Sequence, residues 1–257
     1  MDVPGISRPV LVTLIAVAVL LLATGTSWAL SWVTRHTDTT TRTIPAASTI
    51  VVDATSGDID VIGTDRSDIR LETKQSRSLF GRPHVHIDAG GGRLRLDGKC
   101  SEFELWGTDG RCSVRYRLEV PRDATVRLVT HSGDVTAEDL RGAADLRTRS
   151  GDVQAFDVLG ALRLDSRSGD VHVDSSSTDI DASTISGDVD VRARDATRVR
   201  AHTTSGDVHV RVPDRTYVVR TSAVSGDQHV DVRKDATAPR RIDASTTSGD
   251  VHVDRDG

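Results

Sequence analysis

The residues that could carry chemistry in this 257-residue chain recur together, because the tripeptide Ser-Gly-Asp occurs eight times. The members are Ser56, Gly57, Asp58, Ser132, Gly133, Asp134, Ser150, Gly151, Asp152, Ser168, Gly169, Asp170, Ser186, Gly187, Asp188, Ser205, Gly206, Asp207, Ser225, Gly226, Asp227, Ser248, Gly249 and Asp250. A column of such carboxylates could bind calcium, which prefers oxygen ligands. The calcium-binding roll, however, needs Gly-Gly-x-Gly-x-Asp on a nine-residue period, and this chain has neither feature. We therefore expect these residues to form structural turns, with no metal and no cofactor.

Four histidines fall four residues after the repeat serine, at His172, His209, His229 and His252. Imidazole is a common ligand of transition metals, and the last three histidines come from three consecutive repeats. In other repeats the same position holds Asp, Thr or Gln. A solvated strand face that accepts any polar residue is therefore the simpler interpretation.

Hydroxyl groups near the tripeptide, such as Thr148 with Ser150 and Thr203 with Ser205, could in principle act as nucleophiles. A catalytic serine needs one distinct base and an oxyanion site, whereas these hydroxyls recur in every repeat. We expect them to hydrogen-bond along the stack of repeats, and we predict no catalytic residue. The alternative is an enzyme that acts on polysaccharide, a lyase or a hydrolase, because a β-solenoid can carry charged residues across a surface groove.

The only two cysteines, Cys100 and Cys112, lie close enough in sequence to form one disulfide in an exported domain. Two unpaired thiols in a cytoplasmic domain are the alternative. The loop between them contains Phe103 and Trp106 and is the least repetitive part of the chain. These aromatic residues either mark a binding site or cap one end of the core.

The spacing of the tripeptide indicates how the chain is built. From Ser132 onward the serines are 18, 18, 18, 19, 20 and 23 residues apart. Self-similarity at about twenty residues is the signature of a solenoid, in which each repeat packs only on its neighbours. Regular repeats therefore begin at about residue 126.

Each repeat alternates in a way that predicts two strands. The sixth residue before the serine is always apolar, and the third and fifth residues after it are nearly always Val, Ile or Ala. Polar residues lie between them, as in a strand with one buried face. The Gly-Asp pair supplies the corner, because glycine accepts positive φ and an aspartate carboxylate bonds nearby amides. The last such strand, around Asp250-Val251-His252-Val253, should form an exposed edge.

Residues 65–121 lack the tripeptide but still alternate, as in Arg93-Leu94-Arg95-Leu96 and in Val114 to Val120. They predict further strands with longer loops. We expect one all-β domain over residues 49–254, a single-stranded β-solenoid or β-helix. Its coil should be right-handed, since parallel crossovers prefer that hand.

The N-terminal region predicts a membrane anchor, because residues 10–33 are uncharged and long enough to span a bilayer as a helix. Residues 1–9 would be a cytoplasmic tail and residues 34–48 a Thr-rich linker. A cleaved signal peptide is the alternative, with small residues on either side of Trp28. We expect a single-pass protein of the cell membrane whose C-terminal domain is extracytoplasmic.

The composition argues against two kinds of partner. A net charge of −5 with only three lysines offers no basic patch, so we expect no nucleic acid. Only 3% of the residues are aromatic, so an extended platform for stacking sugar rings is hard to build.

The strand Leu118-Glu119-Val120-Pro121, followed by the Ser-Gly-Asp repeats, resembles the bacterial "putative adhesin" family of β-strand repeats, which is related to LiaG-like envelope proteins. The resemblance spans roughly Ile50 to Val253. It implies a membrane-anchored β-solenoid with a role in adhesion or envelope stress, and it supplies no catalytic residues. The expected function is thus a non-catalytic interaction or scaffold module whose partner is an envelope protein or polysaccharide.

Overall fold

The computed structural model describes residues 36–77, 83–100 and 113–256. The predicted cytoplasmic tail, the predicted membrane segment 10–33 and the predicted disulfide partner Cys112 lie outside these residues, as do Phe103 and Trp106. Within the described ranges no helix has the length and apolar character needed to cross a membrane.

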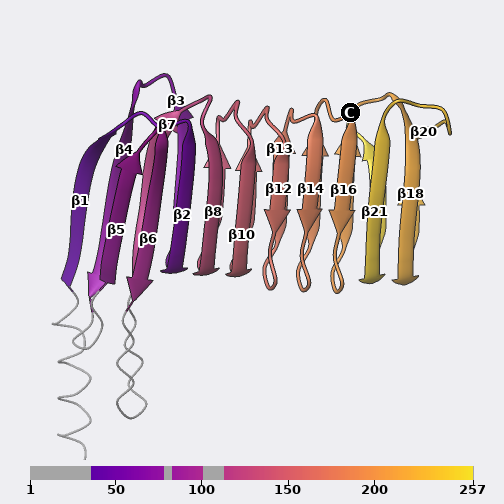
Figure 1. The fold of residues 1–257 in the computed structure, drawn as a ribbon. Helices are drawn as coiled ribbons and strands as arrows, with labels where there is room; N and C mark the ends of the chain where they lie inside the picture. The colour runs from indigo at the N-terminus through magenta and orange to yellow at the C-terminus, as the bar shows by residue number, and fades with distance from the viewer. Residues whose placement is uncertain (1–35, 78–82, 101–112, 257) are drawn as a thin grey trace, which may run out of the picture.

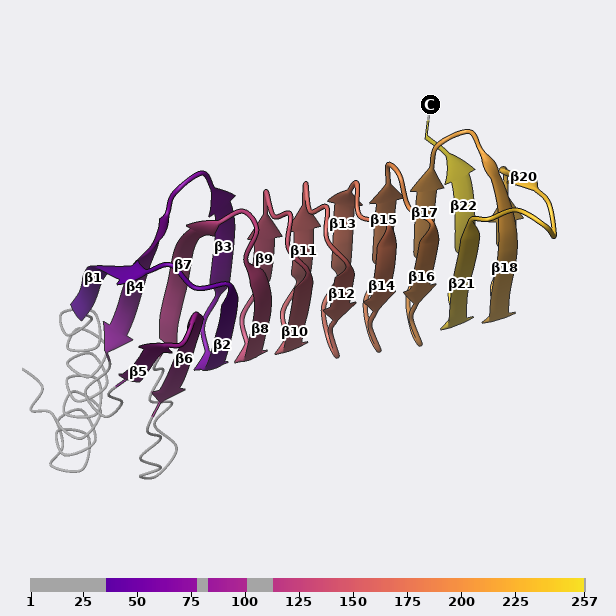
Figure 2. The same cartoon turned by 45° about the horizontal axis from the view of Figure 1, so that its top comes forward.

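Two sheets of eleven strands each lie against one another and form an elongated rod (Figures 1 and 2). Sheet A contains, in hydrogen-bonded order, β1 (His36–Pro45), β4 (Asp68–Arg77), β7 (Ser113–Pro121), β3 (Ile59–Thr64), β9 (Val135–Glu138), β11 (Val153–Phe156), β13 (Val171–Ser175), β15 (Val189–Ala193), β17 (Val208–Val212), β22 (Val251–Arg255) and β19 (Gln228–Val230). Sheet B contains β20 (Arg233–Lys234), β18 (Thr216–Ser225), β21 (Arg241–Ser248), β16 (Arg198–His202), β14 (Asp179–Ser183), β12 (Leu162–Asp165), β10 (Ala144–Ser150), β8 (Thr125–Ser132), β2 (Thr49–Ser56), β6 (Arg93–Cys100) and β5 (Pro83–Gly90).

One Ser-Gly-Asp repeat forms one rung, which consists of a strand in sheet B, the corner, and a strand in sheet A. In the Ser186 rung the inward residues Ile180 and Ala182 precede the corner, Val189 and Val191 follow it, and all four are fully buried. Neighbouring rungs pair in parallel with the repeats aligned, so that Val189 lies between Val171 and Val208. The predicted all-β repeat architecture is therefore confirmed, with two strands per coil.

Glycine is required at the corner because the backbone there is both left-handed and crowded. Gly169 has φ of 144°, and a Cβ atom at this position would lie 2.0 Å from the carbonyl oxygen of Gly151 in the preceding rung. The other corner glycines have φ between 122° and 141° and similar neighbours. No other residue fits this corner without displacing the adjacent rung.

The rungs do not follow one another in space as they do in the sequence. Along the rod their serines run in the order Ser56, Ser132, Ser150, Ser168, Ser186, Ser205, Ser248 and Ser225. The C-terminal strands β21 and β22 are thus inserted between β16/β17 and β18/β19. The prediction of an exposed edge at Asp250 to Val253 is wrong, since Val251 and Val253 are fully buried.

The last rung of the rod is instead formed by β18 and β19, with the two-residue β20 beside the start of β18. The repeat of β18 and β19 carries polar residues at two inward positions, Thr221 and Gln228. With its side-chain amide oriented to satisfy both polar atoms, Gln228 donates to Thr221 Oγ1 at 2.8 Å and accepts from the Ala223 amide at 3.2 Å. A terminal repeat with a polar outer face is the usual cap of a stacked array. This repeat therefore suits the end of the rod better than the C-terminal repeat does.

The opposite end is built from antiparallel strands. β4 pairs with β1 and β7, and β5 forms a hairpin with β6. These strands confirm the strands predicted within residues 65–121, for the part of that range that the structure describes. The predicted linker 34–48 is partly wrong because it contains β1, an edge strand that buries Ile44 and leaves most of its threonines exposed. An edge strand of β-branched polar residues has no apolar alternation to reveal it.

Candidate functional site on the outer faces of the sheets

The corner aspartates form a ladder along one edge of the rod. The backbone amide of Asp170 donates to Oδ1 of Asp152 at 2.8 Å, and the equivalent bond joins each pair of neighbouring rungs from Asp58 to Asp227. The carboxylates therefore bond an amide of the next rung rather than their own turn. Among the described residues, no group of three or more His, Cys, Asp or Glu side chains is placed to hold a metal ion.

The hydroxyl groups that precede the corners are occupied in the same way. Thr148 Oγ1 donates to the Gly133 carbonyl at 3.0 Å, and Thr203 Oγ1 donates to the Gly187 carbonyl at 2.9 Å. Both threonines are buried, whereas Ser150 and Ser205 are exposed at the corner. The prediction that the threonine hydroxyls bond along the stack is confirmed, and they do not form a nucleophile with a base.

The histidines form an outward row on sheet A, as predicted, but in an unexpected order. Because β22 lies between β17 and β19, His252 is the central member. Its ring stacks on His209 with 4.8 Å between centroids and is tilted against His229 at 6.1 Å. His172 is separated from this group by Asp190.

One contact between a serine and a histidine escaped the sequence analysis. Ser245 Oγ lies 3.0 Å from His202 Nδ1, because the inserted β21 brings Ser245 beside β16. Within the described part of the chain no carboxylate contacts the other ring nitrogen of His202. The pair lies on the exposed face of a sheet and lacks the third group that orients a catalytic base.

A row of alternating charge runs along the outer face of sheet B. From the Ser132 rung onward, the fifth residues before the corner serines are, in spatial order, Arg127, Asp145, Arg163, Asp181, Arg200, Asp243 and Arg220. Opposite charges on neighbouring strands stabilise a sheet and like charges destabilise it. The alternation exists only because the C-terminal rung is inserted, since the order of the chain would put Arg200 beside Arg220.

A groove of about 510 Å³ follows this row at the beginning of the sheet B strands. Its floor is made of small residues, among them Thr125, Ala143 and Ala161. Its charged residues are three arginines and three aspartates, namely Arg127, Arg163, Arg198, Asp145, Asp179 and Asp181. None of the described residues forms an ion pair with Arg163, so its guanidinium keeps all its donors.

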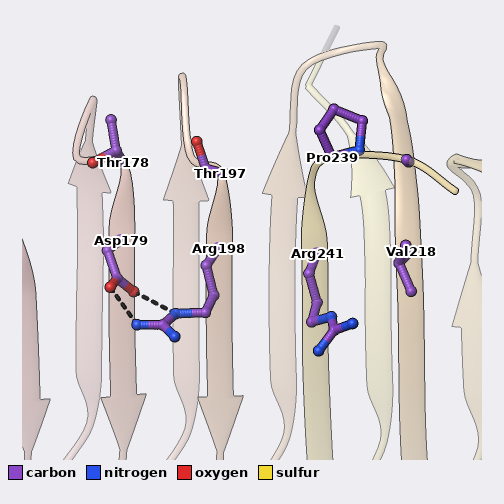
Figure 3. Close-up of a pocket in the computed structure, with 8 residues that line it drawn as sticks. Thr178, Asp179, Thr197, Arg198, Val218, Pro239 and Arg241 are labelled. Atoms are coloured by element: carbon purple, nitrogen blue, oxygen red, sulfur yellow. Dashed lines mark hydrogen bonds and ion pairs between the residues drawn. The ribbon is translucent and has the colours of Figure 1, made fainter.

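A second groove of about 490 Å³ meets the first at Asp179 and Arg198 and continues to β18. Figure 3 shows the two side chains pointing toward one another, with Arg241 and Val218 farther along the rod. The hydrogen bond that Arg198 donates to the Asp179 carboxylate raises the pKa of the Arg198 guanidinium. Together the grooves cross eight strands, from β2 to β18, which corresponds to about 34 Å at the usual strand spacing.

A family model for the Toastrack DUF4097 domain matches residues 43–254 of the sequence. The chain belongs to this family. The Toastrack match begins within β1 and ends within β22, so it includes all eight corners and both grooves. This result agrees with the predicted relation to adhesin-type β-repeat proteins.

Solved structures similar to this Toastrack chain include a "putative cell adhesion protein" from Clostridium sporogenes, with 7% identity, a TM-score of 0.38, and coverage of 86% of this chain and 100% of that one. A "putative adhesin" from Bacteroides fragilis has 11% identity, a TM-score of 0.42, and coverage of 86% and 97%. A "putative lipid binding protein" from Parabacteroides distasonis has 11% identity, a TM-score of 0.41, and the same coverage. No curated protein matches the chain.

Proposed function

We propose that this Toastrack protein is a non-catalytic, adhesin-like interaction module that binds an elongated polymer of the cell envelope along sheet B. The observation that supports this proposal is the pair of joined grooves, which run along the rod over the face of eight strands. A groove of this shape suits a linear ligand better than a compact one. In the larger groove, small residues recur at the start of successive strands, at Thr125, Ala143 and Ala161, and charges of alternating sign follow two residues later, at Arg127, Asp145 and Arg163.

The chemistry of the groove favours a polymer rich in hydroxyl groups, such as a polysaccharide. Arginine only donates hydrogen bonds and an ionised aspartate only accepts them, whereas a hydroxyl group does both. Arg163 and Asp181 lie on neighbouring strands and could bond successive hydroxyls of one chain. Because the larger groove has equal numbers of arginines and aspartates, it does not select a polyanion.

The proposal also includes an anchor in the cell membrane. Residues 10–33 would hold the module on the outer side, with β1 beginning soon after the span. The full chain should therefore stay with the membrane fraction after alkaline washing, while its C-terminal part is digested by protease added to intact cells. Release into the wash would favour the cleaved signal peptide.

The binding proposal is tested with the full chain on a panel of cell-wall and capsular polysaccharides and in a pull-down from envelope extract. Ala161→Arg places a large side chain on the floor of the groove. Gln154→Arg adds the same side chain to the outer face of sheet A and serves as the matched control. We expect retention of at least one polysaccharide that is lost in Ala161→Arg and kept in Gln154→Arg.

Two other outcomes would each replace part of the proposal. Capture of a protein without any polysaccharide would make the partner a protein. Reproducible cleavage of a polysaccharide would show that the module is an enzyme.

A further inference from the structure

The C-terminal rung, formed by β21 and β22, occupies a slot whose two walls precede it in the chain. One wall is β16/β17 and the other is β18/β19. Residues 231–240, which include β20, connect this rung to β19.

The two walls of the slot do not match each other. If they paired directly, Arg200 would lie beside Arg220, because both residues are in register with Asp243. The polar Gln228 would come to lie against the buried Val208, since both are in register with Val251. Like charges side by side and a polar group on an apolar core both destabilise a stack. An empty slot would therefore not close.

The C-terminal rung matches both walls. Thr246 Oγ1 donates to the Gly206 carbonyl at 3.0 Å, and the Gly249 amide donates to the Ser225 carbonyl at 2.9 Å. At the far end of the rung, Asp256 accepts from Arg192 Nε at 2.8 Å. The slot thus selects a Ser-Gly-Asp rung with an acidic residue at the position of Asp243.

The connection to this rung is exposed over most of its length. Arg233 and Lys234 pair with the start of β18, and Asp235 accepts from the amide and the hydroxyl of Thr237 at 2.8 and 2.7 Å. No residue from 231 to 240 is fully buried. Such a segment can change its path at little cost, as the hinge of an exchanged element must.

We propose that the slot between β16/β17 and β18/β19 also binds the C-terminal rung of a second copy, so that two chains exchange β21 and β22 reciprocally. The contacts within the slot are the same whichever copy supplies the rung, and the balance between monomer and dimer is then set by the hinge and by the protein concentration. Exchange also requires a transient opening of β18 and β19, which among the described strands pair only with the inserted rung and with β20. This inference does not depend on what the groove binds.

Cross-linking between two variants of the full chain, each with one added cysteine, tests the exchange. One preparation carries Arg200→Cys and the other carries Asp243→Cys, at positions that are neighbours in the slot. Adjacent strands are about 4.8 Å apart, which is within the range of a disulfide. After the two are mixed at high concentration, warmed to open the end of the rod, cooled and oxidised, we expect a covalent heterodimer.

Arg127→Cys mixed with Asp243→Cys is the matched control, because Arg127 lies on the same outer row but outside the slot. Both mixtures contain the two native cysteines, so the control also measures cross-links through those residues. A second pair, His202→Cys with Ser245→Cys, also joins β16 to β21 and leaves the charged row unchanged. This pair tests the exchange if the first pair fails to fold. A heterodimer yield several-fold above the control supports exchange, and a yield equal to the control for a folded pair overturns it.

Discussion

The interior rungs and the terminal rung are built on the same tripeptide, yet their environments differ. In the Ser186 rung both neighbours are present, and its inward residues Val189 and Val191 are fully buried. In the Ser225 rung one neighbour is missing, Gln228 is exposed, and Val230 is only partly covered. A rung is thus stabilised by a neighbouring rung on each side. The least regular repeat lies at the end of the rod, where one neighbour is missing.

The largest expected effect is a charge buried in an interior rung. Val189→Asp puts a carboxylate between two layers of valine, and we expect a loss of about 4 kcal/mol or more in the free energy of unfolding. Gln228→Asp occupies the equivalent position of the terminal rung and should cost less than about 1 kcal/mol. Urea denaturation followed by circular dichroism measures both, and similar losses would mean that the strand register described here is incorrect.

A smaller effect is expected from adding a Cβ atom at the corners. Gly169→Ala must displace the Gly151 carbonyl and hold a strained φ, which should cost about 3 kcal/mol. At Gly226 the same atom would meet the Gly249 carbonyl at 1.9 Å, but no rung lies beyond it and it can move outward. Gly226→Ala should therefore lower the melting temperature less than Gly169→Ala does.

The threonine hydroxyls that precede the corners allow one variant to weaken an interior rung and another to strengthen the terminal rung. Thr184→Val removes the bond of 2.9 Å to the Gly169 carbonyl and should cost about 1 kcal/mol. The terminal rung has Ala223 at this position, in register with Thr246. Ala223→Thr should stabilise the chain by up to about 1 kcal/mol, because its hydroxyl would reach the Gly249 carbonyl. Thermal unfolding of the two variants should shift in opposite directions.

The smallest expected effect concerns the charged row. Asp243 separates Arg200 from Arg220, and all three side chains face solvent. Asp243→Asn should cost less than about 1 kcal/mol, as exposed charge pairs do. The loss should disappear in high salt, where such interactions are screened. A loss that is unchanged by salt would mean that Asp243 acts through packing instead.

The strands and corners could be predicted from the sequence because each repeat carries its own alternation and its own Gly-Asp turn. The order of the rungs could not, since every repeat has the same register and could pair with any other. Two signals would have helped. The Ser225 repeat departs from the apolar pattern at Thr221 and Gln228, which marks it as a cap. The charge row alternates only when Asp243 is placed between Arg200 and Arg220.

The candidate site was harder to predict than the fold. The groove depends on small residues at the beginning of successive strands, such as Ala143 and Ala161, which look unremarkable in a single repeat. The contact between His202 and Ser245 depends on the rung order as well. The predicted disulfide depends on Cys112, which lies beyond the described ranges, as does the predicted membrane span, and both stay predictions.

Because the corners are uniformly spaced, the number of repeats sets the length of the rod. Between β10 and β16 each repeat adds one strand to both sheets and joins its neighbours through the same amide, carbonyl and hydroxyl bonds. Duplication of one interior repeat would lengthen the rod by about 4.8 Å and leave both ends as they are. The length of such a rod can therefore evolve in fixed steps.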